Sequence, residues 1–278
     1  MKVSVNNEYG ALKEVIVSSV ETYFHHDAIN NNQEYYYKTT PPIKELMVEQ
    51  QMKFFDVLEE TGAKLIHTTP LWDCPDQLNT RDPSFVIGNT FFVSSMKETL
   101  RVNEKKGLSK IIDSIESQIV YLDNCTIEGG DVLLMYDTVF VGISRRTSLD
   151  GVKQLKKHLP QNYNILPIYL KNGFLHLDTV FNILTDEDAI ICSAAIEDDS
   201  IRLLENYFSI VDISLEEQLH LGTNILNISP RKIITQTQNK RINKELNKRG
   251  FEIIEVEYSE IAKLGGAFRC GTCPLVRE

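Results

Sequence analysis

Residues 84–95, SFVIGNTFFVSS, and residues 131–144, DVLLMYDTVFVGIS, share one pattern, in which two short apolar runs are joined by a turn. The turns fall at Asn89-Thr90 and Tyr136-Asp137, so the pattern predicts two β-hairpins. It returns in residues 179–194, TVFNILTDEDAIICSA, and 224–236, NILNISPRKIITQ. Four similar hairpins in one chain indicate a repeat fold.

Each hairpin is followed by a segment with helical periodicity and then by a short strand-like run. The expected helices lie roughly at 104–117, 149–158, 198–208 and 240–249. The opening residues read as another copy, with a strand in 9–19, an irregular stretch at 20–42, a long amphipathic helix at 43–61 and a strand in 63–68. One hairpin-helix-strand unit is too small to bury its own apolar faces, so neighbouring copies must share a core. The sequence therefore predicts an α/β fold with five copies.

A polar residue stands at nearly the same place in successive copies. The series is Asp82, Asp131, Asp178, Asn224 and Cys270, with gaps of 49, 47, 46 and 46 residues. Similar units arranged around one axis present equivalent positions to a common centre. We therefore expect the carboxylates, the amide and the thiol to meet there.

The composition is that of a compact soluble protein. With 42% hydrophobic and 24% charged residues, the chain can build a sizeable core, and no apolar run reaches transmembrane length. The first residues lack the features of a signal peptide, and five cysteines are an odd number for a disulfide framework, so we expect reduced thiols and a cytoplasmic location. The net charge of −10 disfavours nucleic acid and suits a small cation. No linker is apparent, so we expect one domain over residues 1–278, while the sequence leaves open whether the chain forms a homo-oligomer.

Four segments combine reactive side chains with expected strand entrances: TRDPSF, IEGGDVL, LHLDT and the C-terminal LGGAFRCGTCPLVRE. They suggest a cysteine nucleophile, a histidine acid/base and carboxylates around one pocket. His176 and Asp178 are two residues apart, which on a strand would place both on one face. Arg269, next to Cys270, could partly activate the thiol.

These motifs occur in the order found in the guanidine-modifying (pentein) superfamily, which the chain resembles over nearly its full length. The motifs that carry the resemblance are NEYGALKEVIV, TRDPSFVIGN, IEGGDVL, VGISRRTS, LHLDTVFNIL, GTNIL and GGAFRCGTCPLVR. The superfamily includes arginine deiminase, dimethylarginine dimethylaminohydrolase and glycine amidinotransferase. The resemblance implies a five-bladed α/β propeller with pseudo-fivefold symmetry.

The resemblance also implies roles for individual residues. Cys270 would be the nucleophile, His176 the general acid/base, and Asp82 a ligand of the substrate guanidinium. Glu128 would position the guanidinium or orient the histidine, and Asp178 would be a further guanidinium contact. Arg146 resembles an arginine that holds the substrate α-carboxylate. Arg101 would be another such group, with Lys97, Lys105 or Lys106 as alternatives.

The implied reaction is hydrolysis of arginine or an N-substituted arginine to citrulline, with release of ammonia or an amine, through a covalent amidino-cysteine. This chemistry requires no cofactor and no metal. The alternative is an amidinotransferase that passes the amidino group to an amine. A third class, ribosome-binding propellers of the superfamily, lacks the thiol site. The 81 residues ahead of Asp82 leave no room for the extra helical domain usual in arginine deiminases.

Simpler interpretations exist for several of these residues. Asp82, Asp131 and Asp178 could each cap a turn or strand, and we interpret Asp131 as structural. Arg146 could form a solvated charge pair with Arg145. The C-x-x-C of Cys270 and Cys273 could suggest a redox or zinc site, but no helix follows it and no further ligands have suitable spacing.

Overall fold

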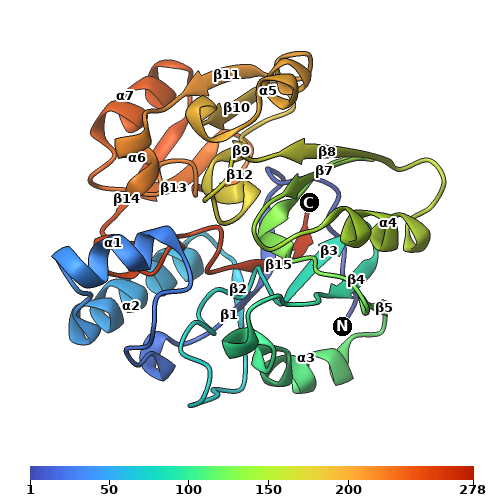
Figure 1. Ribbon diagram of the computed structural model, residues 1–278, viewed down its shortest axis with the longest axis horizontal. Helices are drawn as coiled ribbons and strands as arrows, with labels where there is room; N and C mark the ends of the chain where they lie inside the picture. The colour runs from blue at the N-terminus through green and yellow to red at the C-terminus, as the bar shows by residue number, and fades with distance from the viewer.

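A computed structural model describes residues 1–278, and its strands form five three-stranded sheets (Figure 1). In every sheet the middle strand is antiparallel to one neighbour and parallel to the other. The first sheet contains β15 (Cys273–Arg277), β1 (Leu12–Val17) and β2 (Lys64–His67); the second β3 (Ser84–Ile87), β4 (Thr90–Val93) and β5 (Gln118–Tyr121); the third β6 (Val132–Met135), β7 (Thr138–Ile143) and β8 (Asn164–Tyr169); the fourth β9 (Phe181–Ile183), β10 (Asp188–Ile191) and β11 (Ser209–Asp212); the fifth β12 (Leu226–Ser229), β13 (Lys232–Gln236) and β14 (Glu252–Val256).

The parallel pair in each sheet explains why a helix stands in every copy, since parallel strands require a crossover connection. The α-helices are α1 (Asn31–Thr39), α2 (Lys44–Glu60), α3 (Ser109–Ser114), α4 (Leu149–His158), α5 (Asp198–Glu205), α6 (Leu215–Leu219), α7 (Lys240–Lys248) and α8 (Ser259–Ala262). The 3₁₀ turns are η1 (Val20–Thr22), η2 (Thr99–Arg101), η3 (Glu104–Leu108), η4 (Gly129–Asp131), η5 (Leu177–Thr179) and η6 (Ser193–Ala195). Figure 1 shows α2, α3, α4, α5 and α7 toward the outside of the molecule and β15 near its middle.

The predicted units are confirmed, with two local corrections. The turn of the first hairpin lies at Gly88-Asn89 rather than Asn89-Thr90, because Thr90 pairs with Ile87 in the sheet. Gly88 has φ +57°, which glycine adopts without steric cost. The stretch 20–42, expected to be irregular, contains α1, which starts at the side-chain cap of Asn30. That helix has few apolar residues, so its sequence gave no periodic signal.

The first sheet joins the two ends of the chain. The C-terminal strand β15 pairs antiparallel with β1, so it completes the hairpin that the opening copy lacks. The sequence does not reveal this pairing, because the two strands lie at opposite ends of the chain. Cys270 consequently precedes β15 in the way that Asp82 precedes β3.

Neighbouring sheets contact one another through hydrogen bonds, isolated bridges and apolar side chains. The contacts between consecutive sheets are Ser84–Cys273 (first and second), Ser95–Ile127 (second and third), Leu170–Ile196 (third and fourth), Asn182–Ile225 (fourth and fifth) and the apolar cluster that contains Val15 and Ile234 (fifth and first). Buried apolar side chains fill the space between the sheets in three clusters, with Phe92, Phe181 and Phe268 among their large members.

No helix of the structure has the length and apolar character that a membrane crossing needs. All five cysteines are free, as expected from their number. Cys125 alone among them is partly exposed rather than buried.

Candidate active site

The five residues of the polar series are all buried, and Asp178, Asn224 and Cys270 contact one another directly. The Cys270 Sγ lies 3.1 Å from the Asn224 Nδ2 and 3.4 Å from the Asp178 Oδ2. The Asn224 Oδ1 accepts a hydrogen bond from the Cys270 backbone N–H at 3.1 Å. Asp131 accepts from the Leu177 N–H at 2.8 Å. Asp82 lines one cavity with Cys270, so the prediction that the series meets near one centre is confirmed for Asp82, Asp178, Asn224 and Cys270, while Asp131 joins it only through the backbone next to Asp178.

A small cavity lies at this centre. Its volume is about 10 Å³, roughly enough for one water molecule. Five of the seven predicted site residues line it, while Glu128 and Asp178 lie just behind and bond to lining residues. The lining residues are Ile29, Asn30, Asp76, Asn79, Asp82, Arg101, Arg146, Leu175, His176, Leu264, Gly265 and Cys270.

The thiol of Cys270 is held in its neutral form. Its burial and the carboxylates of Asp178 and Asp82 raise its pKa well above the usual range, and Arg269 opposes them only in part. Arg269 is itself engaged, because it donates to Asp178 at 2.8 Å and to Glu8 at 3.0 Å. Arg269 thus acts on the thiol in the expected direction, but burial and the two carboxylates outweigh its effect on the pKa. The arrangement agrees with a thiol that ionises only when a cation enters.

His176 is charged by its neighbours. The Nε2 lies 2.8 Å from the Glu128 Oε2, and the Nδ1 lies 3.6 Å from the Asp82 Oδ1. Burial opposes the imidazolium, but Asp82 and Glu128 outweigh it and raise the pKa of His176 to about 9. The charge and hydrogen bond of His176, together with Arg146, lower the pKa of Glu128 to about 2 against the effect of its burial. His176 can therefore hold a proton at neutral pH.

One premise for selecting His176 is wrong. The segment Leu177–Thr179 is the 3₁₀ turn η5, not a strand, so a two-residue spacing does not place His176 and Asp178 on one strand face. His176 contacts Asp82 and Glu128, while Asp178 contacts Cys270 and Arg269. The turn thus separates the two side chains into different parts of one site.

The glycine pair of the EGGD motif allows this close packing. A Cβ at Gly130 would lie 2.7 Å from the Asp82 Oδ1 and 2.9 Å from the His176 Cγ. Real Cβ atoms do not approach other atoms so closely, so only glycine lets the η4 backbone pass beside the acidic group and the imidazole.

The two predicted carboxylate-binding arginines are buried and already paired. Arg101 donates to the Asp82 Oδ2 at 2.7 Å and forms two bonds with Glu104, whose pKa burial raises to about 7. Arg146 donates to the Glu128 Oε2 at 3.3 Å and to the Ile29 carbonyl oxygen at 3.1 Å. Both line the cavity, so a substrate would have to share them with these partners.

Sequence reasoning missed three polar residues of the cavity wall, namely Asn30 and the pair Asp76 and Asn79. Asp76 lies 3.2 Å from the His26 Nε2 and accepts from the Gln33 side chain at 3.0 Å. The Asn79 Oδ1 is buried and has no hydrogen-bond partner. The position of Asp76 and Asn79 in the same short segment as Asp82, CPDQLNTRD, was a signal that could have found them.

Three of the site residues could also approach a metal ion. Asp82, Glu128 and His176 offer ligand atoms within 4.8 Å of one another. Arg101 and Arg146 already bond to these carboxylates, so a metal ion would meet two fixed positive charges. The arrangement suits a diffuse organic cation better than a compact divalent one.

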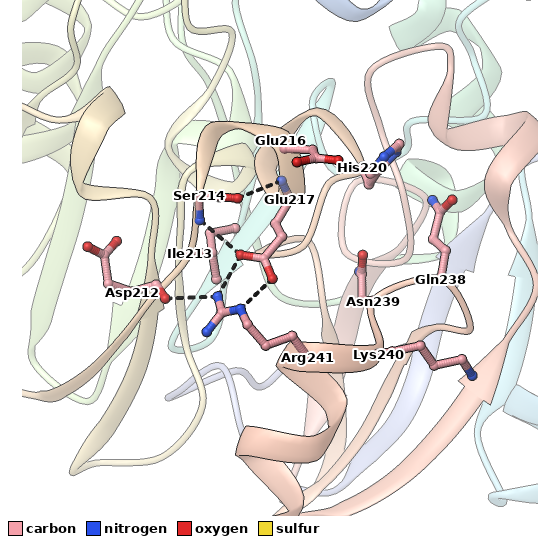
Figure 2. Close-up of a pocket in the computed structure, with 10 residues that line it drawn as sticks. All are labelled: Asp212, Ile213, Ser214, Glu216, Glu217, His220, Gln238, Asn239, Lys240 and Arg241. Carbon is pink, nitrogen blue, oxygen red and sulfur yellow. Dashed lines mark hydrogen bonds and ion pairs between the residues drawn. The ribbon is translucent and has the colours of Figure 1, made fainter.

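The largest depression on the protein lies elsewhere, between α6 and the start of α7 (Figure 2). Figure 2 shows Arg241 bonded to Glu217 across it. None of the predicted site residues lines this depression, and only one of its ten lining residues is apolar. Its size alone therefore does not make it the active site.

Comparisons with known proteins identify the family. The family model described as "N,N dimethylarginine dimethylhydrolase, eukaryotic" matches residues 19–277. The uncharacterized protein YkgA of Bacillus subtilis (strain 168) is 37% identical over 276 residues, which are 99% of this chain and 96% of YkgA. An arginine deiminase of Bacillus thuringiensis subsp. konkukian (strain 97-27) is 28% identical over 256 residues, and the match spans 73% of this chain but only 62% of that protein.

Solved structures share the fold at low sequence identity. The amidinotransferase SxtG of the saxitoxin pathway of Microseira wollei has a TM-score of 0.86 with 19% identity, covering 99% of this chain and 98% of SxtG. The N-terminal domain of ArgZ, an arginine dihydrolase of cyanobacteria, has a TM-score of 0.86 with 22% identity, covering 95% of this chain and 97% of that domain.

Proposed function

Because this chain belongs to the N,N-dimethylarginine dimethylhydrolase family within the guanidine-modifying (pentein) superfamily, we propose that it is a cysteine-dependent hydrolase of a guanidino substrate. The substrate would be arginine or an N-substituted arginine. The products would be the ureido compound citrulline and ammonia or an amine.

One observation carries the proposal: the cavity wall presents buried acceptor atoms that lack donors. The Asp82 Oδ1 and the Asn79 Oδ1 are buried without a hydrogen-bond partner, and both residues line the cavity with Cys270. Unpaired buried acceptors are costly, so they favour a guest that brings only donors and positive charge. A guanidinium is such a guest, since it is planar, cationic and rich in N–H groups.

The first chemical step follows from the contacts of the thiol. A bound guanidinium offsets the carboxylates that hold the pKa of Cys270 high, so the sulfur loses its proton to water when the substrate binds. The thiolate then forms a C–S bond to the guanidinium carbon. His176 carries the proton that the departing nitrogen needs, and the C–N bond breaks to release a neutral amine.

The second step returns the enzyme to its starting state. Water adds to the carbon of the amidino-cysteine while His176, now neutral, accepts a proton from the water. The C–S bond breaks, the hydroxyl proton of the tetrahedral adduct passes to the departing sulfur, and the neutral thiol and the ureido product form. Glu128 holds the imidazole through the 2.8 Å contact with Nε2 and stabilises its charged form during both steps.

The second candidate is an amidinotransferase, in which an amine rather than water attacks the intermediate. The fold similarity to SxtG keeps this candidate open.

The test is incubation of the purified protein with arginine, with and without a panel of amines, followed by mass spectrometry. Citrulline without an added acceptor supports hydrolysis, whereas ornithine together with a new guanidino compound supports transfer. Cys270→Ser and His176→Ala should abolish turnover, and Cys273→Ser serves as the matched control, because Cys273 is also buried but does not line the cavity. Absence of any product from the wild-type protein, or full activity of Cys270→Ser, would refute the proposal.

We also propose that the five sheets close into one ring, a five-bladed propeller that makes residues 1–278 a single domain. The contacts from each sheet to the next, including those of the fifth sheet with the first, support this arrangement. Limited proteolysis checks it, since a single domain should resist cleavage between sheets until the whole chain unfolds.

A further inference from the structure

A second cavity adjoins the catalytic one. It has a volume of about 230 Å³ and lies among α1, the segment 173–175 and α6. Leu175 and Gly265 line both cavities, so the two cavities meet at these residues. Gly265 has φ +92°, and a Cβ there would lie 2.7 Å from the Asn30 Oδ1, so a side chain at this point would obstruct the junction.

The second cavity has no charged residue in its lining. Apart from Leu175 and Gly265, the lining consists of Asn31, Asn32, Gly173, Phe174, Thr179, Leu215, Gln218 and Leu219. The amide groups of its polar members donate to backbone carbonyl oxygens of the wall: Asn31 to Gly173, Asn32 to Leu219 and Gln218 to Thr179. The polar wall is therefore largely satisfied by itself, and the remaining surface suits a neutral, mainly apolar group.

The α-amino acid end of a substrate does not fit these properties. A carboxylate requires a cation, and the buried arginines Arg101 and Arg146 line the catalytic cavity instead. Arg145 donates to the Asn31 Oδ1 at 3.4 Å, but this contact lies on the exposed side of the second cavity. The charged end of the substrate is therefore expected at the arginines and not here.

The second cavity meets the catalytic cavity beside the residue that would protonate the departing amine. His176, the proposed proton donor to that amine, directly follows Leu175, the residue shared by both cavities. A substituent on the departing nitrogen would therefore pass Leu175 and Gly265 into the second cavity.

We propose that this second cavity binds the nitrogen substituent of the substrate and that the enzyme accepts guanidines whose departing amine carries an apolar group larger than methyl. This inference rests on the proposed hydrolase function. At about 230 Å³ the second cavity is many times larger than the catalytic cavity of about 10 Å³, so a four-carbon chain fits and a methyl leaves most of the space empty.

The size of the expected effect follows from burial of methylene groups. Each buried methylene contributes about 0.8 kcal/mol, which is roughly fourfold in kcat/KM. From Nω-methylarginine to Nω-butylarginine, three added methylenes should raise kcat/KM roughly fiftyfold.

The test compares Nω-methyl, Nω-propyl and Nω-butylarginine in the wild type, Leu215→Trp and Leu149→Trp, with the released amine measured. Leu215 is the first residue of α6, follows the N-cap Ser214 and is 53% exposed on the rim of the cavity. Leu149 has the matching place in α4, after the N-cap Ser148, and is 44% exposed, but it lies away from the cavity. Tryptophan at 215 should fill the cavity and reduce the butyl-to-methyl ratio at least tenfold, while Leu149→Trp should keep the wild-type ratio.

The outcomes separate this inference from the function on which it rests. A rising series that Leu215→Trp alone flattens supports the inference. A wild-type series that falls or stays flat, or a rising series that Leu215→Trp leaves unchanged, overturns it while hydrolysis itself stands. Failure to hydrolyse arginine and every substituted arginine would overturn the hydrolase. In that case the melting temperature would be compared with butylguanidine and with methylguanidine present. If butylguanidine raised it no more than methylguanidine did, the second cavity as a substituent site would also be overturned.

Discussion

The charge of Asp178 is expected to keep the free enzyme unreactive. Its Oδ2 lies 3.4 Å from the Cys270 Sγ, and two unit charges at that distance interact by about 5 kcal/mol at an effective dielectric constant of about 20. Arg269, which pairs with the same oxygen at 2.8 Å, offsets part of this repulsion. Asp178→Asn preserves the shape of the side chain and removes its charge. Even if only a third of the repulsion remains uncompensated, the thiolate fraction at a fixed pH should rise at least tenfold.

The assay is alkylation of Cys270 by iodoacetamide between pH 6 and 10, followed by mass spectrometry of the Cys270 peptide. The variant should react at least tenfold faster at pH 8, with its inflection at lower pH, yet turn over substrate more slowly because a guanidinium contact is lost. The pH of the inflection is the decisive measurement. A substitution that merely opened the cavity would change the alkylation rate but not the pH at which the thiol ionises. Asp188→Asn is the control, because Asp188 is a buried carboxylate paired with Arg249 far from the thiol. An unchanged inflection in Asp178→Asn would refute the electrostatic reasoning.

Three further predictions concern the surroundings of the thiol. The pKa of His176 is raised to about 9, so its charge stabilises the native state below pH 6.5, and this stability is lost as the pH rises toward 9. The urea midpoint of the wild type should therefore fall between pH 6.5 and 9, and His176→Gln should lack this fall. Arg269 lowers the pKa of Glu8 to about 2 despite burial, so Glu8 contributes stability above pH 4.5 that disappears as the pH falls toward 2. Glu8→Gln should be less stable than the wild type by about 3 kcal/mol at pH 7, and it should lose less stability on acidification. Equal acid sensitivity of the two proteins would contradict the ion pair. Gly130→Ala should lower kcat at least tenfold, because the new methyl group displaces Asp82 and the imidazole; wild-type kinetics in a folded variant would show that the close approach is unimportant.

The repeat unit and the composition of the site could be predicted from local sequence. Turn residues, alternating apolar runs and helical periodicity depend on neighbours a few residues apart, and they placed α4 at the expected residues and α7 within one residue of its expected end. The equal spacing of Asp82, Asp131, Asp178, Asn224 and Cys270 predicted that these residues would meet, since a repeat turns equal spacing into equivalent position.

Other features depended on contacts between distant segments. The pairing of β15 with β1, the engagement of Arg269 by Glu8 and the neutral state of the thiol all arise from residues far apart in the chain. Helix α1 likewise has no strong periodic signal, and Asn30 at its start instead bonds to the Leu264 carbonyl oxygen beside the cavity.

The sequence by itself thus determined the unit, the number of copies and the kinds of chemical group at the centre, because these are recorded in local periodicity and in spacing. Only the tertiary structure decided which charges offset one another, how small the catalytic cavity is, and that an uncharged cavity adjoins it behind Leu175. Burial and electrostatic interaction depend on distances in space, and the order of residues along a chain does not contain those distances until the sheets pack together.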